Sequence, residues 1–370
     1  MRIAVTGSRG FIGANLVTRL RERPATDVVE IHRGDETPSL DGVDAVVHLA
    51  GVNRPPDPSG FAQGNAELTA RLACSLQAIG RPVPVVLSSS TQAALDNPYG
   101  ASKRSAEQAL QDYARASGAD VRIYRLTNVF GKWARPNYNS AVATFCHNTV
   151  HGIPITVHDP SAPLRLVYID DVCDAFLRDI DDFAAGVRAD GGFREAGPVH
   201  ETTVGEVAAM ISGFPRSRSE ATVDRVGAGL CRALYATYLS HIPPTDFAYR
   251  PVRHVDPRGE FAEIVRSADS GQVSYFTAHP GVTRGGHYHH TKNEKFLVLR
   301  GQARFRFRDM RTGATHEVDV SGSDPTVVET VPGWAHDITN IGDGEMLVML
   351  WANEAFDRER PDTIATRLGS

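Results

Sequence analysis

The stretch Thr6-Gly7-Ser8-Arg9-Gly10-Phe11-Ile12-Gly13 decides how the N-terminal half of the chain folds. It directly follows the apolar run Ile3-Ala4-Val5 and opens a segment whose apolar residues recur at helical spacing. Glycines at this spacing allow a tight turn, a close backbone approach to a pyrophosphate, and close packing of a helix on a strand. The N-terminus of that helix would face the anion. We therefore predict a dinucleotide site, whose contacts in this stretch are Gly7, Arg9, Gly10, Phe11, Ile12 and Gly13.

Outside this stretch, strand-like and helical patterns alternate as far as about residue 245. Further strand-like runs cover residues 28–31, 43–49, 83–87 and 121–124. This alternation predicts an α/β fold with a Rossmann-like, doubly wound parallel sheet. From about residue 252 short strands follow one another between Gly, Pro and Asp turns, which is typical of an antiparallel sandwich or barrel. The predicted joint lies at residues 242–246, and the expected domains are 1–245 and 246–370.

Composition excludes several classes of protein. The chain has 370 residues, 41% of them hydrophobic and 22% charged, which is ordinary for a globular protein and argues against a mainly disordered one. No apolar run approaches the ~20 residues of a membrane helix, and the N-terminus shows no signal-peptide pattern. A net charge of −5 without a basic tract argues against a nucleic-acid partner. The four cysteines are scattered without a CxxC pair, which predicts free thiols and a cytoplasmic location.

The end of the second predicted strand bears on the choice of cofactor. It reads Glu30-Ile31-His32-Arg33. An NAD site favours an acidic residue here for the ribose 2′-hydroxyl, whereas an arginine suits the 2′-phosphate of NADP. We predict NADPH with His32 and Arg33 as contacts, although a shift of one residue in register would bring Glu30 forward.

A second motif adds proton-transfer chemistry. Tyr99-Gly100-Ala101-Ser102-Lys103 follows an apolar run that ends in Ser88-Ser89-Ser90. Residues four apart share a helix face, so the lysine ammonium can lower the pKa of the phenol and also hold a ribose. The tyrosine can then exchange a proton with a carbonyl or hydroxyl oxygen, to which a strand-end serine can hydrogen-bond.

With these motifs the first half resembles the extended short-chain dehydrogenases/reductases that act on nucleotide-diphosphate sugars. Segments 48–51, 125–131 and 167–172, together with Asn65, carry the resemblance further. It implies that the catalytic group is Ser90, Tyr99 and Lys103, with Ser89 as the alternate serine. It also implies that Asn128 lies near the sugar nucleotide, and that the cofactor contacts include Leu49, Ala50 and Gly51.

The chain departs from that family's pattern in two places. Ser90 and Tyr99 are only nine residues apart, which predicts a trimmed pocket rim. The arginine that often grips the diphosphate is absent at the expected register, and Arg165 stands one residue off. Three residues are candidates to contact the diphosphate in its place: Lys132, Arg135 and Asn137. Each of them could equally be an ordinary surface residue.

The second half carries a metal-ligand pattern. His287 and His289 alternate and so share a strand face, Glu294 begins a return strand, and His336 follows after Pro332-Gly333. Three imidazoles and a carboxylate suit one divalent transition metal; zinc is our first choice, although the sequence does not separate it from iron, nickel or manganese. The spacings resemble both motifs of the cupin family and imply an all-β cupin barrel. His290 and Lys292, in the turn beside the ligands, are catalytic candidates or else part of a solvated loop.

Over essentially its whole length the chain resembles the bifunctional capsular polysaccharide-assembling enzymes called CapF. The carrying segments are 49–55, 96–100, 130–133, 136–140 and 289–298. The resemblance implies C3 epimerisation of a UDP-2-acetamido-2,6-dideoxy-4-hexulose in the cupin domain, followed by NADPH-dependent reduction at C4. The implied product is a UDP-N-acetyl-6-deoxy-L-talosamine, on the route to N-acetyl-L-fucosamine. This order is chemically reasonable, because a ketone acidifies its neighbouring C–H bonds only until it is reduced.

Two other readings remain open. In the first, the reductase acts alone on a 4-keto sugar nucleotide, and the cupin is a metal-stabilised dimerisation or sugar-binding module. In the second, the chain is a nucleotide-sensing or scaffolding protein rather than an enzyme, which the intact Tyr99/Lys103 pair argues against. The expected partners are a UDP-amino-sugar and a second copy of the chain, since edge strands of small barrels often pair across subunits.

Overall fold

The structure is a computed structural model that describes residues 1–32, 40–189, 191–251, 253–256, 259–262, 265–267, 271–354, 359 and 361–368. Contacts divide the chain into two compact units, Met1–Val129 with Arg165–Glu201, and Phe130–Leu164 with Thr202–Ser370. Segments 130–164 and 202–245 thus lie in the same compact unit as the C-terminal strands. The expected domain boundary at residue 245 stays a prediction.

The first unit is built on a six-stranded parallel sheet in the order β2-β1-β3-β4-β5-β8. Its strands are β1 (Arg2–Thr6), β2 (Asp27–Ile31), β3 (Ala45–His48), β4 (Val85–Ser90), β5 (Val121–Leu126) and β8 (Phe193–Arg194). The predicted doubly wound parallel sheet is therefore confirmed. The strand order reverses at β1, and in such sheets ligands bind beyond the carboxyl ends of the strands at that point.

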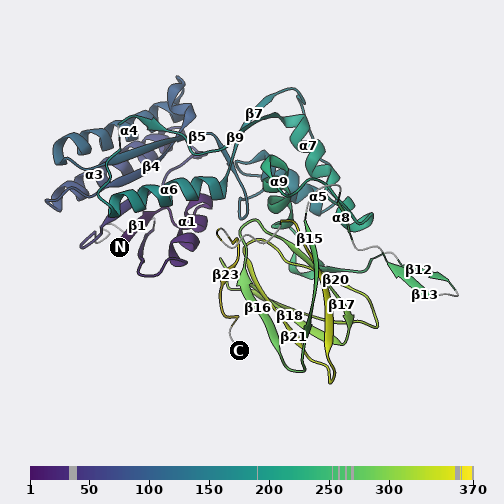
Figure 1. Ribbon diagram of the computed structural model, residues 1–370. Coiled ribbons are helices and arrows are strands. Elements are labelled where there is room, and N and C mark those ends of the chain that lie inside the picture. Colours follow the sequence, from purple (N-terminus) through teal and green to yellow (C-terminus); the bar gives the residue numbers. More distant parts are fainter. Residues whose placement is uncertain are drawn as a thin grey trace. The chain divides into compact units, whose positions relative to one another are not determined.

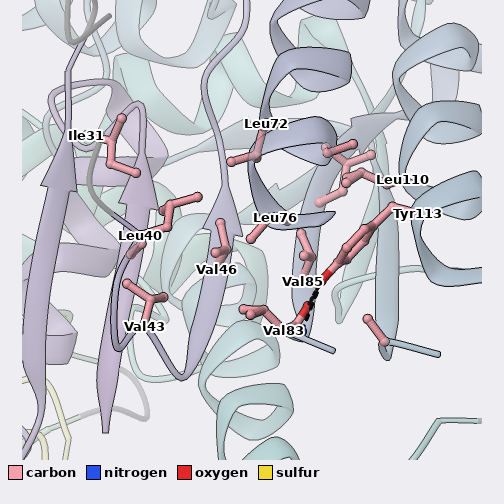
Figure 2. Packing of buried hydrophobic residues seen from close by; sticks show 14 of the residues in the cluster. Ile31, Leu40, Val43, Val46, Leu72, Leu76, Val83, Val85, Leu110 and Tyr113 are labelled. Carbon is pink, nitrogen blue, oxygen red and sulfur yellow. Dashed lines mark hydrogen bonds between the residues drawn. The ribbon is translucent and has the colours of Figure 1, made fainter. Parts of the chain in front are cut away.

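Helices cover both faces of this sheet. Figure 1 shows α1 (Phe11–Arg21) and α6 (Ile169–Ala184) on one face, with α3 (Leu68–Ala78) and α4 (Pro98–Ser117) on the other. Beneath α3 and α4 lies a cluster of buried side chains that includes Leu76, Leu110, Val46 and Val85 (Figure 2). The Tyr113 hydroxyl ends this cluster with hydrogen bonds to the backbone of Val83. Each fully buried leucine contributes roughly 1.5–3 kcal/mol, so this packing holds α4 and its catalytic candidates against the sheet.

Shorter elements complete the connections in and around this unit. They are α2 (Ser59–Phe61), the π-helical turn η1 (Ala62–Glu67), the 3₁₀ turn η2 (Thr91–Ala94), and a three-stranded sheet of β6 (Asn128–Phe130), β7 (Pro163–Tyr168) and β9 (Val199–Thr203).

The second unit begins with helices. They are α5 (Ala141–Val150), α7 (Val204–Gly213), α8 (Arg216–Ser219), α9 (Gly229–Leu239) and the 3₁₀ turn η3 (Pro244–Asp246). The helices α5, α7 and α9 pack against one another. Small strand pairs follow, formed by β10 (Thr222–Val223) with β14 (Arg266–Ser267), and by β12 (Arg253–Asp256) with β13 (Gly259–Ala262).

The rest of this unit consists of two five-stranded antiparallel sheets, as expected from the closely spaced strands. The first is β11 (Ala248–Tyr249), β20 (Val327–Glu329), β17 (Glu294–Arg300), β22 (Met346–Ala352) and β15 (Gln272–Ala278), in that order. The second is β19 (Thr315–Ser321), β18 (Gln302–Asp309), β21 (Trp334–Asn340), β16 (Thr283–Tyr288) and β23 (Ile364–Ala365). The rings of Phe296 and Phe305, one from each sheet, lie 5.5 Å apart, so the sheets face each other.

Among the described residues, no helix is both long enough and apolar enough to span a bilayer.

Candidate active site and metal centre

The glycine loop between β1 and α1 has the geometry that dinucleotide binding needs. Gly7 has a φ of +70°, and a Cβ on it would lie 2.7 Å from the backbone nitrogen of Ala50. A Cβ on Gly13 would lie 2.2 Å from the carbonyl oxygen of Gly7. The helix begins at Phe11 with Gly10 as its N-cap, and Arg9 is exposed beside it. Only glycine fits at positions 7 and 13, and the open helix N-terminus can bind an anion.

The residues predicted to select the cofactor lie near this loop. The Ser8 hydroxyl is 3.3 Å from Nδ1 of His32, which places the imidazole beside the glycines. Glu30 forms an ion pair with Arg21, with 2.6 Å between the charged atoms. Arg33 lies outside the described residues, so its role toward a 2′-phosphate stays a prediction.

A buried polar network supports the predicted cofactor contacts Leu49, Ala50 and Gly51. The Thr6 hydroxyl accepts hydrogen bonds from the amides of Leu49 and Ala50, each at 3.1 Å. The same hydroxyl lies 2.6 Å from Nδ1 of His48, whose Nε2 is 2.9 Å from the hydroxyl of Thr69. Burial, with the charge of Lys103 adding to it, lowers the pKa of His48 to about 3, so this imidazole is neutral. His48 lies in the segment 48–51 that carries the family resemblance, but no role was expected for it.

The structure brings the predicted reductase residues together at the start of α4. Asn97 caps this helix by accepting a hydrogen bond from Gly100, which fixes Tyr99 and Lys103 one turn apart on one face. The Lys103 ammonium donates to the carbonyl of Ser88 at 2.9 Å, so the lysine reaches the end of β4. The ring of Phe61 lies 5.6 Å from that of Tyr99 and forms an apolar wall beside the phenol.

The two candidate serines have different partners. Ser90 hydrogen-bonds to the Tyr99 phenol and also accepts a hydrogen bond from the amide of Gln92. Ser89 is buried and donates to the carboxylate of Glu107, which also pairs with Arg125 at 2.7 Å. The geometry therefore favours Ser90 over Ser89 as the serine that shares an oxygen with Tyr99.

Burial dominates the electrostatics of this group. It raises the pKa of Tyr99, against the opposing hydrogen bond from Ser90. It lowers the pKa of Lys103 to about 8, against the opposing charge of Glu107. The expected lowering of the phenol pKa by Lys103 is therefore not seen, because the ammonium is directed at Ser88 and desolvation of the phenol outweighs it. Tyr99 therefore keeps its phenol proton, and the neighbouring Lys103 ammonium can bind a ribose or stabilise negative charge on a substrate oxygen.

Asn65 joins the loop after β3 to α4. Its side chain accepts from the amide of Val52 and donates to the Val52 carbonyl, both at 2.9 Å, and it also donates to Ser102 at 3.0 Å. Asn65 lies within the π-helical turn η1, a local widening that often marks functional sites. The buried amide thus holds the Gly51–Val52 loop next to the Tyr99 helix.

The four predicted substrate contacts lie in different surroundings. Asn128 is exposed and donates to the carbonyl of Arg165, whose own guanidinium pairs with Glu195 at 3.0 Å. Arg135 and Asn137 are exposed, and Arg135 lies 5.4 Å from the ring of Tyr138. Their contacts with a sugar nucleotide stay predictions.

The fourth, Lys132, is fully buried in the second unit. Its ammonium lies 5.6 Å from the ring of Trp133, which has a φ of +68°. A Cβ on Gly333 would come within 2.8 Å of that indole. The Lys132–Trp133 segment therefore packs against the predicted Pro332-Gly333 motif of the C-terminal strands.

The four predicted metal ligands converge, with their candidate donor atoms all within 4.8 Å of one another. His287 on β16 pairs directly opposite His336 on β21, after a register shift at Gly285 that re-aims the strand. Glu294 at the start of β17 has a carboxylate oxygen 3.3 Å from Nε2 of His289 and 3.4 Å from Nε2 of His336. All four side chains are buried or half-buried.

The pKa shifts of His287 and Glu294 suit a metal ion. Burial and the neighbouring imidazoles lower the pKa of His287 to about 3. Burial alone would raise the pKa of Glu294, but hydrogen bonds and charge from His289 and His336 hold it well below its usual value. Nδ1 of His336 is buried without a hydrogen-bond partner among the described residues, and its Nε2 faces the Glu294 carboxylate at 3.4 Å. Neutral imidazoles and an ionised carboxylate with unused lone pairs are the forms that bind a divalent transition metal, so the donor set fits one.

The two catalytic candidates in the adjoining turn point to different neighbours. The Lys292 ammonium lies 3.2 Å from the Glu294 carboxylate, within the cluster. The His290 ring lies 5.5 Å from the ring of Tyr288, which packs with Ala335 and Leu368. Because Tyr288 and the neighbouring His287 point to opposite faces of β16, His290 is turned toward the side away from the ligands. Geometry therefore favours Lys292 over His290 as a group that could reach a substrate at the metal.

Sequence reasoning missed one residue at this site. The carboxylate of Asp362 accepts hydrogen bonds from the amides of His290, Thr291 and Lys292, at 2.9, 2.6 and 2.7 Å. Its position near the C-terminus, far from both motifs, gives no signal in the sequence.

Comparison with known proteins identifies the family of this chain. Residues 3–190, just over half of the chain, match the NAD dependent epimerase/dehydratase family. The chain belongs to this family. Membership implies a nicotinamide dinucleotide as cofactor. Residues 254–364 match the polysaccharide biosynthesis C-terminal domain.

Similar proteins extend the match to the whole chain. The UDP-2-acetamido-2,6-beta-L-arabino-hexul-4-ose reductase of Pseudomonas aeruginosa is 52% identical over 373 residues, covering 100% of this chain and 99% of that protein. The crystal structure of the capsular polysaccharide assembling protein CapF from Staphylococcus aureus has 39% identity, a TM-score of 0.66 and full coverage of both chains. The expected resemblance to CapF is thus confirmed. The UDP-glucuronic acid 4-epimerase of Bacillus cereus, at 19% identity and a TM-score of 0.50 over 57% of this chain and 83% of that one, shares the fold alone.

Proposed function

We propose that this protein is a bifunctional nucleotide-sugar enzyme. Its C-terminal sheets would form a cupin that epimerises C3 of a UDP-2-acetamido-2,6-dideoxy-4-hexulose, and its N-terminal domain would reduce C4 to a UDP-N-acetyl-6-deoxy-L-talosamine. The observation that carries the proposal is that one chain holds two clusters of candidate functional residues, Ser90–Tyr99–Lys103 and the His/Glu cluster that could hold a metal. The whole-length relative named a hexul-4-ose reductase supports the reductase half.

At the reductase site, NADPH would supply the hydride. Tyr99 would donate its proton to the C4 oxygen, and its raised pKa means that the phenol is protonated at neutral pH. Ser90 would hydrogen-bond to the same oxygen and so orient the ketone. Lys103 would hold the ribose and lend positive charge as the alkoxide forms.

At the second site, a divalent ion held by His287, His289, Glu294 and His336 would polarise the ketone and stabilise the enolate formed when C3 loses its proton. Lys292, which already lies beside Glu294, would exchange the C3 proton there, taking it as the neutral amine and returning a proton as the ammonium. His290 remains a second candidate for that role, with its ring against Tyr288. The buried side chains around this cluster would keep bulk water away from the carbanion at C3.

Two finer proposals concern the bound groups. NADPH is proposed over NADH because His32 stands beside the glycine loop and Glu30 is engaged by Arg21. If this is right, Arg33→Ala will raise KM for NADPH far more than KM for NADH. Zinc is proposed as the metal because three imidazoles and one carboxylate suit it, and elemental analysis of the purified protein tests that choice.

We further propose a cytoplasmic homodimer. All four cysteines are free thiols, as a reducing compartment requires. The edge strand β15 leaves Val273 63% and Tyr275 74% exposed, which is costly unless another chain covers it. Sedimentation of the wild type and of Tyr275→Lys tests this interface, and a monomeric wild type would reject it.

A second candidate function has one observation in its favour. The whole-length relative in Pseudomonas aeruginosa is named only as a reductase. In this alternative the reductase acts alone, and the C-terminal sheets form a metal-stabilised dimerisation or sugar-binding module.

The deciding experiment separates the two chemistries by mutation. The purified protein is given the 4-keto sugar nucleotide in deuterated water, with and without NADPH, and NMR follows C3 and C4. Tyr99→Phe should stop NADPH oxidation, by ~10²–10⁴-fold, while deuterium still enters C3. His336→Ala should stop exchange while a ketone that fits the first site is still reduced. Absence of deuterium exchange in the wild type would reject the epimerase and favour the alternative in which the reductase acts alone. Loss of both activities in Tyr99→Phe, with the fold intact, would refute the model of two separate sites.

A further inference from the structure

We infer that Asp362 is a positioning residue of the metal centre, holding the turn 290–292 with its carboxylate and the ring of His289 with its carbonyl oxygen. This inference rests on the proposed metal function. It concerns a residue that lies more than twenty positions from any ligand in the sequence, and that neither motif includes.

The carboxylate contacts hold the turn between the second and third ligands. Oδ1 accepts from the amide of His290 at 2.9 Å, and Oδ2 accepts from the amides of Thr291 and Lys292 at 2.6 and 2.7 Å. Oδ2 also accepts from the Thr291 hydroxyl at 3.1 Å. Three successive amides directed at one carboxylate leave the turn little freedom, and charge-assisted bonds of this kind are about twice as strong as neutral ones.

The backbone of Asp362 acts on a ligand directly. Nδ1 of His289 hydrogen-bonds to the Asp362 carbonyl oxygen. A carbonyl oxygen can only accept, so Nδ1 carries a hydrogen and is not available to a metal. Nε2 is the nitrogen that faces Glu294, at 3.3 Å. The Asp362 contact therefore leaves Nε2 as the nitrogen through which His289 would bind a metal, and it fixes the plane of the ring.

The segment that carries Asp362 is itself anchored. β23 pairs with β16, with Ala365 opposite His287, and the amide of Thr366 donates to the carbonyl of Gly286 at 2.8 Å. Leu368 is buried with Tyr288 and Ala335. These contacts hold residues 362–368 along the strand that bears His287, so Asp362 links two ligand-bearing segments through a fixed support.

The test measures metal binding rather than turnover. Full-length wild type, Asp362→Asn and the matched control Asp343→Asn are stripped with a chelator and titrated with Co²⁺ and with Zn²⁺ against a chromophoric competitor. Asp343 is an exposed aspartate in the turn before β22. We expect Asp362→Asn to raise the Kd for both ions by ~10–100-fold and to shift the absorption bands of bound Co²⁺, which report ligand geometry. Asp343→Asn should match the wild type in both.

Each outcome is decisive. Unchanged Kd and unchanged Co²⁺ bands in Asp362→Asn would overturn the positioning role, while a wild type that binds neither ion would reject the proposed metal centre itself. Should metal-free Asp362→Asn fail to fold, Thr291→Val removes only the hydroxyl contact and should still raise the Kd severalfold in a folded protein. An unchanged Kd for Thr291→Val in that case would overturn the role.

Discussion

Lys103 keeps its charge in a position where burial makes that charge costly. Its side chain is 9% exposed, and its pKa falls from 10.5 to about 8. Because the folded pKa lies below the unfolded one, the folded state releases this proton first, and stability rises with pH between the two values. At neutral pH the buried ammonium costs roughly 3 kcal/mol, at about 1.4 kcal/mol for each pKa unit. A cost of this size is typical of a functional group, since a structural role would be met by an apolar residue.

The lowered pKa predicts an alkaline limit on reduction. If the reductase needs the ammonium of Lys103, kcat/KM for ketone reduction should fall as pH rises through about 8, where the free enzyme loses that proton. Tyr99 does not interfere, because its pKa is raised. The measurement is a pH profile of kcat/KM, with Lys103→Arg as the control, because a guanidinium stays charged throughout. The arginine variant should be slower but lack the limb, and an identical limb in both proteins would assign it to another group.

Ser89 and Ser90 show where sequence spacing is insufficient at this scale. Both end the same strand, and alternation tells only that they point to opposite faces. Contacts from Glu107 and Tyr99, each in another part of α4, distinguish them.

At the scale of elements, the turn between β1 and α1 is the most tightly constrained. The close approach of Gly13 to the Gly7 carbonyl involves backbone atoms on both sides, so neither can move aside. Gly13→Ala should therefore destabilise the protein by ~1–3 kcal/mol and weaken dinucleotide binding at least tenfold.

The measurement for Gly13→Ala is thermal unfolding together with NADPH fluorescence titration. The matched control is Gly191→Ala in the same unit, where an added Cβ would meet nothing within 4 Å. Equal effects of the two substitutions would show that the glycine loop tolerates a Cβ at position 13.

Residues 215–219 lie between α7 and β10. Their Pro, Ser and Arg content predicts a loop, yet they contain the short helix α8. Arg218 bonds to the buried carboxylate of Glu329 at 2.7 Å, and Lys295 pairs with the same carboxylate. Two cations on one buried anion hold its pKa low, although burial alone would raise it. Lys295 follows the ligand Glu294 in β17 and, through the shared Glu329 carboxylate, joins α8 to β17.

At the scale of the whole molecule, the metal should be a stabilising ligand of the second unit. A bound ion that prefers the folded state adds about 2.7 kcal/mol at a hundredfold excess over its Kd. Chelation should therefore lower the unfolding temperature of the C-terminal sheets and leave NADPH binding at the glycine loop unchanged.

Calorimetry with and without a chelator tests this expectation. His336→Ala is the control, because it should already melt at the lower temperature and respond little to chelation. Identical melting of the wild type in both conditions would mean that no ion is bound in the folded protein.

The sequence by itself determined the parts whose geometry follows from short spacing. Glycine positions at a strand–helix turn, Tyr99 and Lys103 one helical turn apart, and the alternating His287 and His289 are all set by the local periods of helix and strand. The candidate residues of the reductase site, two of the candidate metal ligands and the parallel sheet could be predicted for this reason.

The tertiary structure alone decided everything that depends on residues distant in the chain. It separated Ser90 from Ser89, turned Lys292 but not His290 toward the ligands, and brought Asp362 to the metal turn. It also packed Trp133 against Gly333, two hundred positions along the chain. The physical reason is that such contacts are set by how whole faces are buried against one another, and burial depends on the complete fold rather than on spacing within a segment.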